Sequence, residues 1–192
     1  MRLSRTLVST TGLAVGVLLS TAGLAAAQPI EQEHVHESSS EVIEDFCGDL
    51  TVRHDFEADV YFSGKPHGPD GLIYFADRFR GTDSWTNLAN DKTFTVAFTG
   101  QRKDLRVTDN GDGTLTILLL GAGRTFVYGP DGTRLFLDAG TFRVSFLVDH
   151  GGTPTDPSDD EEIEGSFEVV KEAGRADTDG RDFCDDLHEF IG

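Results

Sequence analysis

The sequence is poor in positive charge. Its 192 residues include 16 lysines and arginines against 34 aspartates and glutamates, a formal net charge of −18. Such a surface repels phosphate backbones and anionic lipid, which disfavours nucleic-acid binding. The sequence also lacks a nucleophile elbow, an H-E-x-x-H motif, a phosphate loop and a dinucleotide fingerprint. We therefore predict no cofactor, and an enzymatic function is less expected than binding.

Long apolar runs are also scarce, and the longest lies near the N-terminus. The basic start Met1–Arg5 is followed by the apolar stretch Leu13–Leu19 and by small residues ending in Ala25–Ala27. This order predicts a secretory signal peptide over 1–27. The alternative is an uncleaved membrane anchor, which the interrupting Gly, Ser and Thr residues oppose. We expect a secreted, extracellular chain with no stable membrane insertion after cleavage.

Cysteine is limited to two residues, Cys47 and Cys184, which stand in similar Phe-Cys-x-Asp-Leu frames. An even number in an exported chain predicts a disulfide, and these two bracket nearly all of the strand-like sequence. The alternative is two free thiols. Because no C-x-x-C redox motif occurs, we interpret the bridge as structural.

Apolar residues between the cysteines recur with a period of two, which is typical of strands. In the longest run, Thr51–Phe62, a mostly apolar face that includes His54 alternates with a mostly polar one. Turns such as Asp109–Gly113 and Gly129–Gly132 separate the runs. The pattern predicts an all-β, antiparallel meander of 8–9 strands with a short helix at Arg181–Ile191. A calycin-like β-barrel is favoured over a β-sandwich because closure removes sheet edges.

The domain organisation follows from a change in composition. Residues 28–45 are polar, acidic and serine-rich, with few aliphatic side chains, so they predict a flexible acidic tail. Residues 46–192 predict a single β domain, which is long enough to bury a core.

Phenylalanine is the abundant aromatic residue, with 14 copies against one tryptophan. Many copies fall on the predicted inward faces, where they either fill the interior or line a cavity for one small apolar ligand. The candidate ligand-binding residues are Phe56, Phe75, Phe94, Phe98, Phe142 and Phe146.

His54 and Asp77 are the polar residues predicted on inward faces. If they pair, they form a candidate acid/base centre, and the alternative is a structural pair. A barrel isomerase or cyclase, in the manner of allene oxide cyclase or dirigent barrels, is the enzymatic alternative, and it rests on fold analogy alone.

Acidic clusters supply weak candidates for calcium, chiefly Asp156, Asp159, Asp160 and Glu162 in a long acidic loop. None of the clusters fits the twelve-residue calcium loop, so a solvated loop is the simpler interpretation and we predict no metal site. His34 and His36 supply too few ligands for a stable site.

Trp85 lies among polar residues that predict a loop. It is either a packing residue or the exposed anchor of an extracellular protein-interaction module. This module is the third functional alternative.

Five stretches in order resemble a group of secreted actinobacterial β-domain proteins of unknown function. They are Phe46–Gly48, Gly71–Phe75, Trp85–Lys92, Lys103–Leu105 and Asp109–Thr114. Leu88 and Asp91 depart from the proline and glycine of that group's turn. The resemblance implies export and a β domain, and it supplies no catalytic residues. The leading prediction is a secreted, non-enzymatic β-barrel that binds a small apolar ligand or an extracellular protein.

Overall fold

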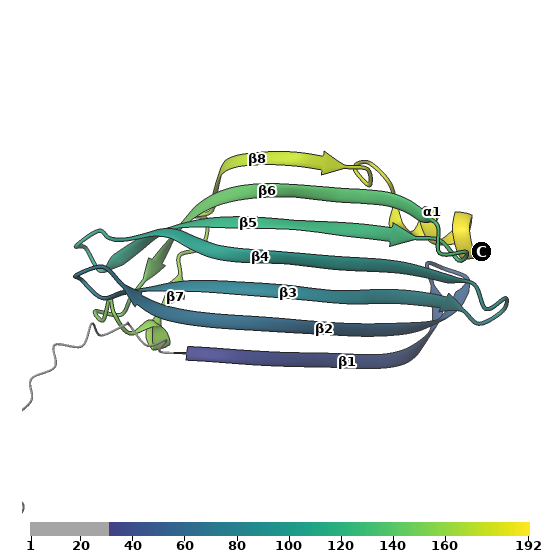
Figure 1. The fold of residues 1–192 in the computed structure, drawn as a ribbon, viewed down its shortest axis with the longest axis horizontal. Coiled ribbons are helices and arrows are strands. Elements are labelled where there is room, and N and C mark those ends of the chain that lie inside the picture. Colours follow the sequence, from purple (N-terminus) through teal and green to yellow (C-terminus); the bar gives the residue numbers. More distant parts are fainter. Residues whose placement is uncertain (1–30) are drawn as a thin grey trace, which may run out of the picture.

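The computed structural model describes residues 31–192, and the predicted signal peptide lies outside them. Most of the described residues lie in strands, which form one antiparallel sheet (Figure 1). Its elements are β1 (Glu31–Phe46), β2 (Leu50–His67), β3 (Leu72–Asn87), β4 (Thr93–Asp109), β5 (Thr114–Tyr128), β6 (Arg134–Asp149), the 3₁₀ helix η1 (Pro157–Asp159), β7 (Glu161–Glu162), β8 (Glu168–Ala176) and α1 (Phe183–Ile191). The predicted antiparallel meander, C-terminal helix and disulfide are confirmed.

The sheet is open, and the predicted closure into a barrel is wrong. Strands β1 to β6 pair in chain order, and both β7 and β8 pair with the free side of β6. No ladder joins β1 to β8 in the part of the chain that the structure describes. Period-two alternation is the same in open and closed sheets, so it does not predict closure. Glutamates at Glu33, Glu37 and Glu41 place charge along β1, which protects an open edge from pairing.

Most of segment 28–45, which the composition predicts to be a flexible tail, forms strand β1 instead. It pairs with β2 from Glu31 to Phe46, although nearly all of its side chains are exposed. The tail was predicted because these side chains bury little apolar surface. An edge strand instead satisfies its backbone groups through the ladder, and cross-strand pairs such as His34–Asp59 add to it.

We call the face of the sheet that packs against α1 the inner face, and the opposite one the outer face. One end of the inner face holds the main core, in which α1 covers strands β2 to β5. The buried members of this core are Leu50, Val52, Trp85, Phe94, Val127, Leu187 and Ile191. No helix among the described residues is long and apolar enough to span a membrane.

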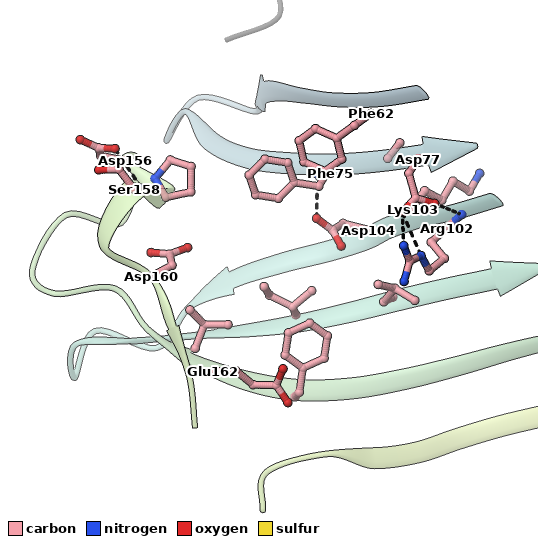
Figure 2. Close-up of a pocket in the computed structure, with 16 residues that line it drawn as sticks. Phe62, Phe75, Asp77, Arg102, Lys103, Asp104, Asp156, Ser158, Asp160 and Glu162 are labelled. Carbon is pink, nitrogen blue, oxygen red and sulfur yellow. Dashed lines mark hydrogen bonds and ion pairs between the residues drawn. The ribbon is translucent and has the colours of Figure 1, made fainter. Parts of the chain in front are cut away.

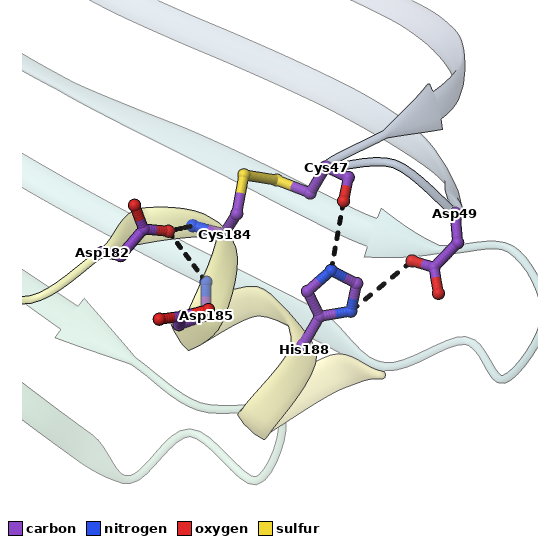
Figure 3. The surroundings of a disulfide bond; sticks show 6 residues. All are labelled: Cys47, Asp49, Asp182, Cys184, Asp185 and His188. Carbon is purple, nitrogen blue, oxygen red and sulfur yellow. Dashed lines mark hydrogen bonds and ion pairs between the residues drawn. A yellow bond between two sulfur atoms is a disulfide. The ribbon is translucent and has the colours of Figure 1, made fainter.

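Several polar contacts hold α1 in place. The Asp182 carboxylate accepts from the N–H groups of Cys184 and Asp185, which satisfies the start of the helix. The Asn87 amide donates to the Ile191 carbonyl at 2.7 Å inside the core. The disulfide Cys47–Cys184 joins α1 to the β1–β2 turn, with a sequence separation of 137 (Figure 3).

The opposite end of the inner face is covered by segment 150–166, which contains η1 and β7. A smaller buried cluster lies at this end, with Val107, Leu115 and Val148 at its centre. Figure 1 shows α1 and the η1–β7 region at opposite ends of the long strands. The sheet is therefore covered at both ends, and no element of residues 31–192 covers the middle of its inner face.

Candidate ligand cavity

A cavity lies on the inner face between the strands and segment 150–166 (Figure 2). Its volume is about 760 Å³, which is within the usual range for pockets that hold small molecules. Strands β2 to β6 all contribute to its wall. The covering segment contributes η1 and its flanking residues.

The floor of the cavity is apolar. Phe62 and Phe75 stack with their ring centroids 5.3 Å apart. The Phe75 ring lies over Gly64, where a Cβ atom would come within 2.7 Å of it, so glycine makes room for the ring. The other apolar residues of the floor are Ile117, Leu119, Phe146 and Val148.

An ion pair stands at one side of the cavity. The Arg102 guanidinium lies 2.6 Å from the Asp77 carboxylate, and the Arg102 backbone N–H also donates to Asp77. The two residues are directly opposed in the β3–β4 ladder, so their pairing is local. The positive charge of Arg102 is therefore already paired with the Asp77 carboxylate within the protein.

Asp104 is a half-buried polar group in the wall. The β3–β4 ladder ends at Ala76 and Lys103, so the N–H of Phe75 has no carbonyl partner there and donates to the Asp104 carboxylate at 2.7 Å. A register shift in β4 between Asp104 and Arg106 lies beside this position. Burial raises the pKa of Asp104 to about 6, and the single backbone hydrogen bond only partly offsets this.

The covering segment supplies further carboxylates. Asp156 caps η1 by accepting from the N–H of Ser158, and Asp159 accepts from the Thr153 hydroxyl at 2.8 Å. Asp160 differs, because its Oδ1 atom is buried without a hydrogen-bond partner among the residues that the structure describes. Burial, and then the charge of Asp159, raise the pKa of Asp160.

The four acidic residues considered for calcium thus have different surroundings. Asp156 and Asp159 bond within the segment, and Asp156, Asp160 and Glu162 line the cavity. Among residues 31–192, no group of three or more His, Cys, Asp or Glu side chains is placed to hold a metal ion.

The sequence-predicted acid/base pair does not form. His54 bonds to Asp83 and stacks on Trp85 near the α1 end, whereas Asp77 pairs with Arg102. Asp77 faces Phe62 in the β2–β3 ladder, eight residues from His54. At about 3.3 Å per residue the two side chains are roughly 26 Å apart. The barrel isomerase alternative therefore loses its only candidate catalytic pair.

The six candidate phenylalanines divide into three groups. Phe75 and Phe146 line the cavity, and Phe94 is buried in the core under α1. The remaining three, Phe56, Phe98 and Phe142, lie in the uncovered middle of the inner face. Trp85 was expected in a loop, but it lies on β3 and is buried in the core, because it packs against the rings of α1 and β4.

Sequence reasoning missed the charged site residues Asp104 and Arg102, and also the apolar lining residues Phe62, Ile117, Leu119 and Val148. The sequence did contain a signal for the two charged residues. Phe94, Val96 and Phe98 point inward on every second residue, and the same alternation continues to Arg102 and Asp104. The apolar residues Leu105 and Val107 suggested that the inward positions change from even-numbered to odd-numbered residues before Asp104. The register shift between Asp104 and Arg106 places this change after Asp104.

No family model, curated protein or solved structure matches the chain in the three comparisons made with known proteins. The resemblance to secreted actinobacterial proteins stays a prediction.

Proposed function

We propose that this protein is exported and binds a small, largely apolar molecule in the cavity under segment 150–166, without catalysing a reaction. The observation that carries the proposal is the cavity itself, with its floor of aromatic and aliphatic side chains and a volume of about 760 Å³. Burial of apolar ligand surface contributes about 25 cal/mol per Å², so such a floor supplies most of the binding free energy.

Two further features support export and binding. The disulfide Cys47–Cys184 is compatible with an oxidising extracellular compartment. The polar groups at the cavity are few and set around an apolar floor, which is the usual composition of small-molecule sites.

The test is fluorescence titration of the mature, disulfide-bonded protein with an apolar dye, using adjacent residues of β5 as site and control. Leu119 lines the cavity, whereas Leu118 stands on the outer face. We expect Leu119→Trp to fill part of the cavity and lower dye affinity about tenfold, equivalent to about 1.4 kcal/mol. Leu118→Trp should change it less than about twofold. No dye binding by the wild-type protein, or equal effects of both variants, would refute the proposal.

The uncovered middle of the inner face favours a second function, binding of a protein partner. Phe142 is 39% exposed there, and Phe56 and Phe79 each lie 6.4 Å from Phe98 between ring centroids. Exposed apolar clusters of this kind mark interaction surfaces. Phe142→Ser separates the two functions: unchanged dye affinity places the dye in the cavity, whereas a loss of affinity places apolar binding on the middle of the sheet.

A further inference from the structure

Charge is divided between the two faces of the sheet. When the ladder register is followed from β1 to β8, every lysine and arginine of these described strands stands at an outer-face position except Arg102. Carboxylates do occupy inner-face positions, and examples are Glu33, Glu37, Asp104 and Glu172. The inner face is therefore apolar and acidic, and it complements a ligand that is apolar and positively charged.

The cavity shows the same imbalance at atomic detail. Its lining includes Asp77, Asp104, Asp156, Asp160 and Glu162 against two cations. Arg102 is one of these cations and is already paired with Asp77. Lys103 is the other, and its ladder position is on the outer face. The cavity lining therefore has more carboxylates than cationic side chains that could pair with them.

Two of these carboxylates have few internal partners. Asp104 accepts a hydrogen bond from the Phe75 N–H, and the Oδ1 atom of Asp160 is buried with no hydrogen bond. Carboxylates with so few internal donors attract a positively charged group in the adjoining cavity. Figure 2 shows Asp104, Asp160 and Glu162 around the space between the strands and the covering segment.

We propose that the ligand of this cavity is an amine, with an apolar body on the Phe62–Phe75 floor and a protonated nitrogen held by the negative charge of Asp104 and Asp160. This inference rests on the proposed function and specifies its ligand class. An ammonium group supplies both the missing charge and up to three hydrogen-bond donors. A metal ion is a poorer fit because the described residues offer no group of three ligating side chains.

The ligand series for the test has one apolar body and three head groups. The mature, disulfide-bonded protein is titrated at pH 7.5 by calorimetry with 1-naphthylmethylamine, 1-naphthylmethanol and 1-naphthylacetate. Charged hydrogen bonds contribute about 1.5–3 kcal/mol, so we expect the amine to bind about 10- to 100-fold more tightly than the alcohol. The carboxylate should bind most weakly of the three. Equal binding of amine and alcohol would overturn the amine assignment and leave the proposed function standing, whereas no binding of any probe would remove both.

Substitutions locate the amine. Asp104→Asn keeps an acceptor for the Phe75 N–H, and Asp160→Asn removes the unpartnered charge. Each should lower the affinity for the amine about tenfold and leave that for the alcohol within about twofold, because only the charged head group is affected. Glu161→Gln is the matched control, since Glu161 is exposed on β7 and pairs with Asp149 away from the lining. Parallel losses for amine and alcohol would indicate a structural role and overturn the assignment.

Calcium chloride alone is titrated as well. Displacement of the amine by calcium at micromolar concentration, abolished by Asp160→Asn, would make this a metal site and overturn the proposal. Absence of such competition supports the amine.

Discussion

Asp104→Asn should stabilise the protein at neutral pH, although it removes a group from the cavity. The carboxyl is half-buried beside Phe75, and desolvation raises its pKa in the folded protein to about 6 from an ordinary value of 3.8. Since each pKa unit is equivalent to about 1.36 kcal/mol, ionised Asp104 costs at most about 3 kcal/mol of folding stability. Asparagine has a similar shape and keeps the hydrogen bond from the Phe75 N–H, so it should recover about 1.5–3 kcal/mol of this.

The gain should depend on pH in a defined direction. Because the pKa of Asp104 is raised by folding, its favourable contribution is complete below pH 3.8 and is lost as pH rises to about 6. The difference in unfolding free energy between variant and wild type should therefore be near zero below pH 3.8, grow from there to pH 6, and stay constant above it. Comparing the two proteins at each pH cancels the contributions of the other carboxylates.

Urea denaturation of both proteins at several pH values measures this difference. At pH 7.5 the melting temperature of Asp104→Asn should exceed that of the wild type by about 3–12 °C. A variant that is less stable at pH 7.5, or a difference that is the same at all pH values, would show that Asp104 is not desolvated as the cavity geometry requires.

Two further predictions concern the core. Replacing both Cys47 and Cys184 with serine should lower the unfolding free energy by up to about 5 kcal/mol in the chain-entropy model. The reason is that the bridge closes a loop with a sequence separation of 137. A loss of less than about 1 kcal/mol, measured by urea denaturation, would contradict this. Phe94→Ala should cost about 3–5 kcal/mol because Phe94 is 1% exposed under α1, whereas Phe142→Ala should cost about 1 kcal/mol or less since Phe142 is 39% exposed. Equal losses in thermal melts would contradict the division of the inner face into a covered end and an uncovered middle.

The sequence predicted the strands and the disulfide because both have local signals. Alternation from Val52 to Phe62 indicates which side chains share a face, and this assignment agrees with the β2–β3 register. The two cysteines bracket the strand runs, which predicted their pairing.

The errors have a common cause, since each depended on a partner segment that the residues concerned do not reveal by their own composition or alternation. Strand β1 forms because β2 offers it a ladder, and nothing in the composition of 28–45 reports that partner. Trp85 is buried because α1 returns over it from the other end of the chain. Asp104 faces the cavity because the β3–β4 ladder ends beside it, and sequence alternation does not show where a ladder ends.

The most direct test of the central claim is to observe where a bound apolar molecule lies. Isotope-filtered NMR of the mature, methyl-labelled protein with 1-naphthylmethylamine measures contacts between the naphthalene protons and individual methyl groups. The account predicts contacts to Ile117, Leu119 and Val148, which line the cavity. Contacts confined to Ala58 and Val60, in the uncovered middle of the inner face, would contradict it.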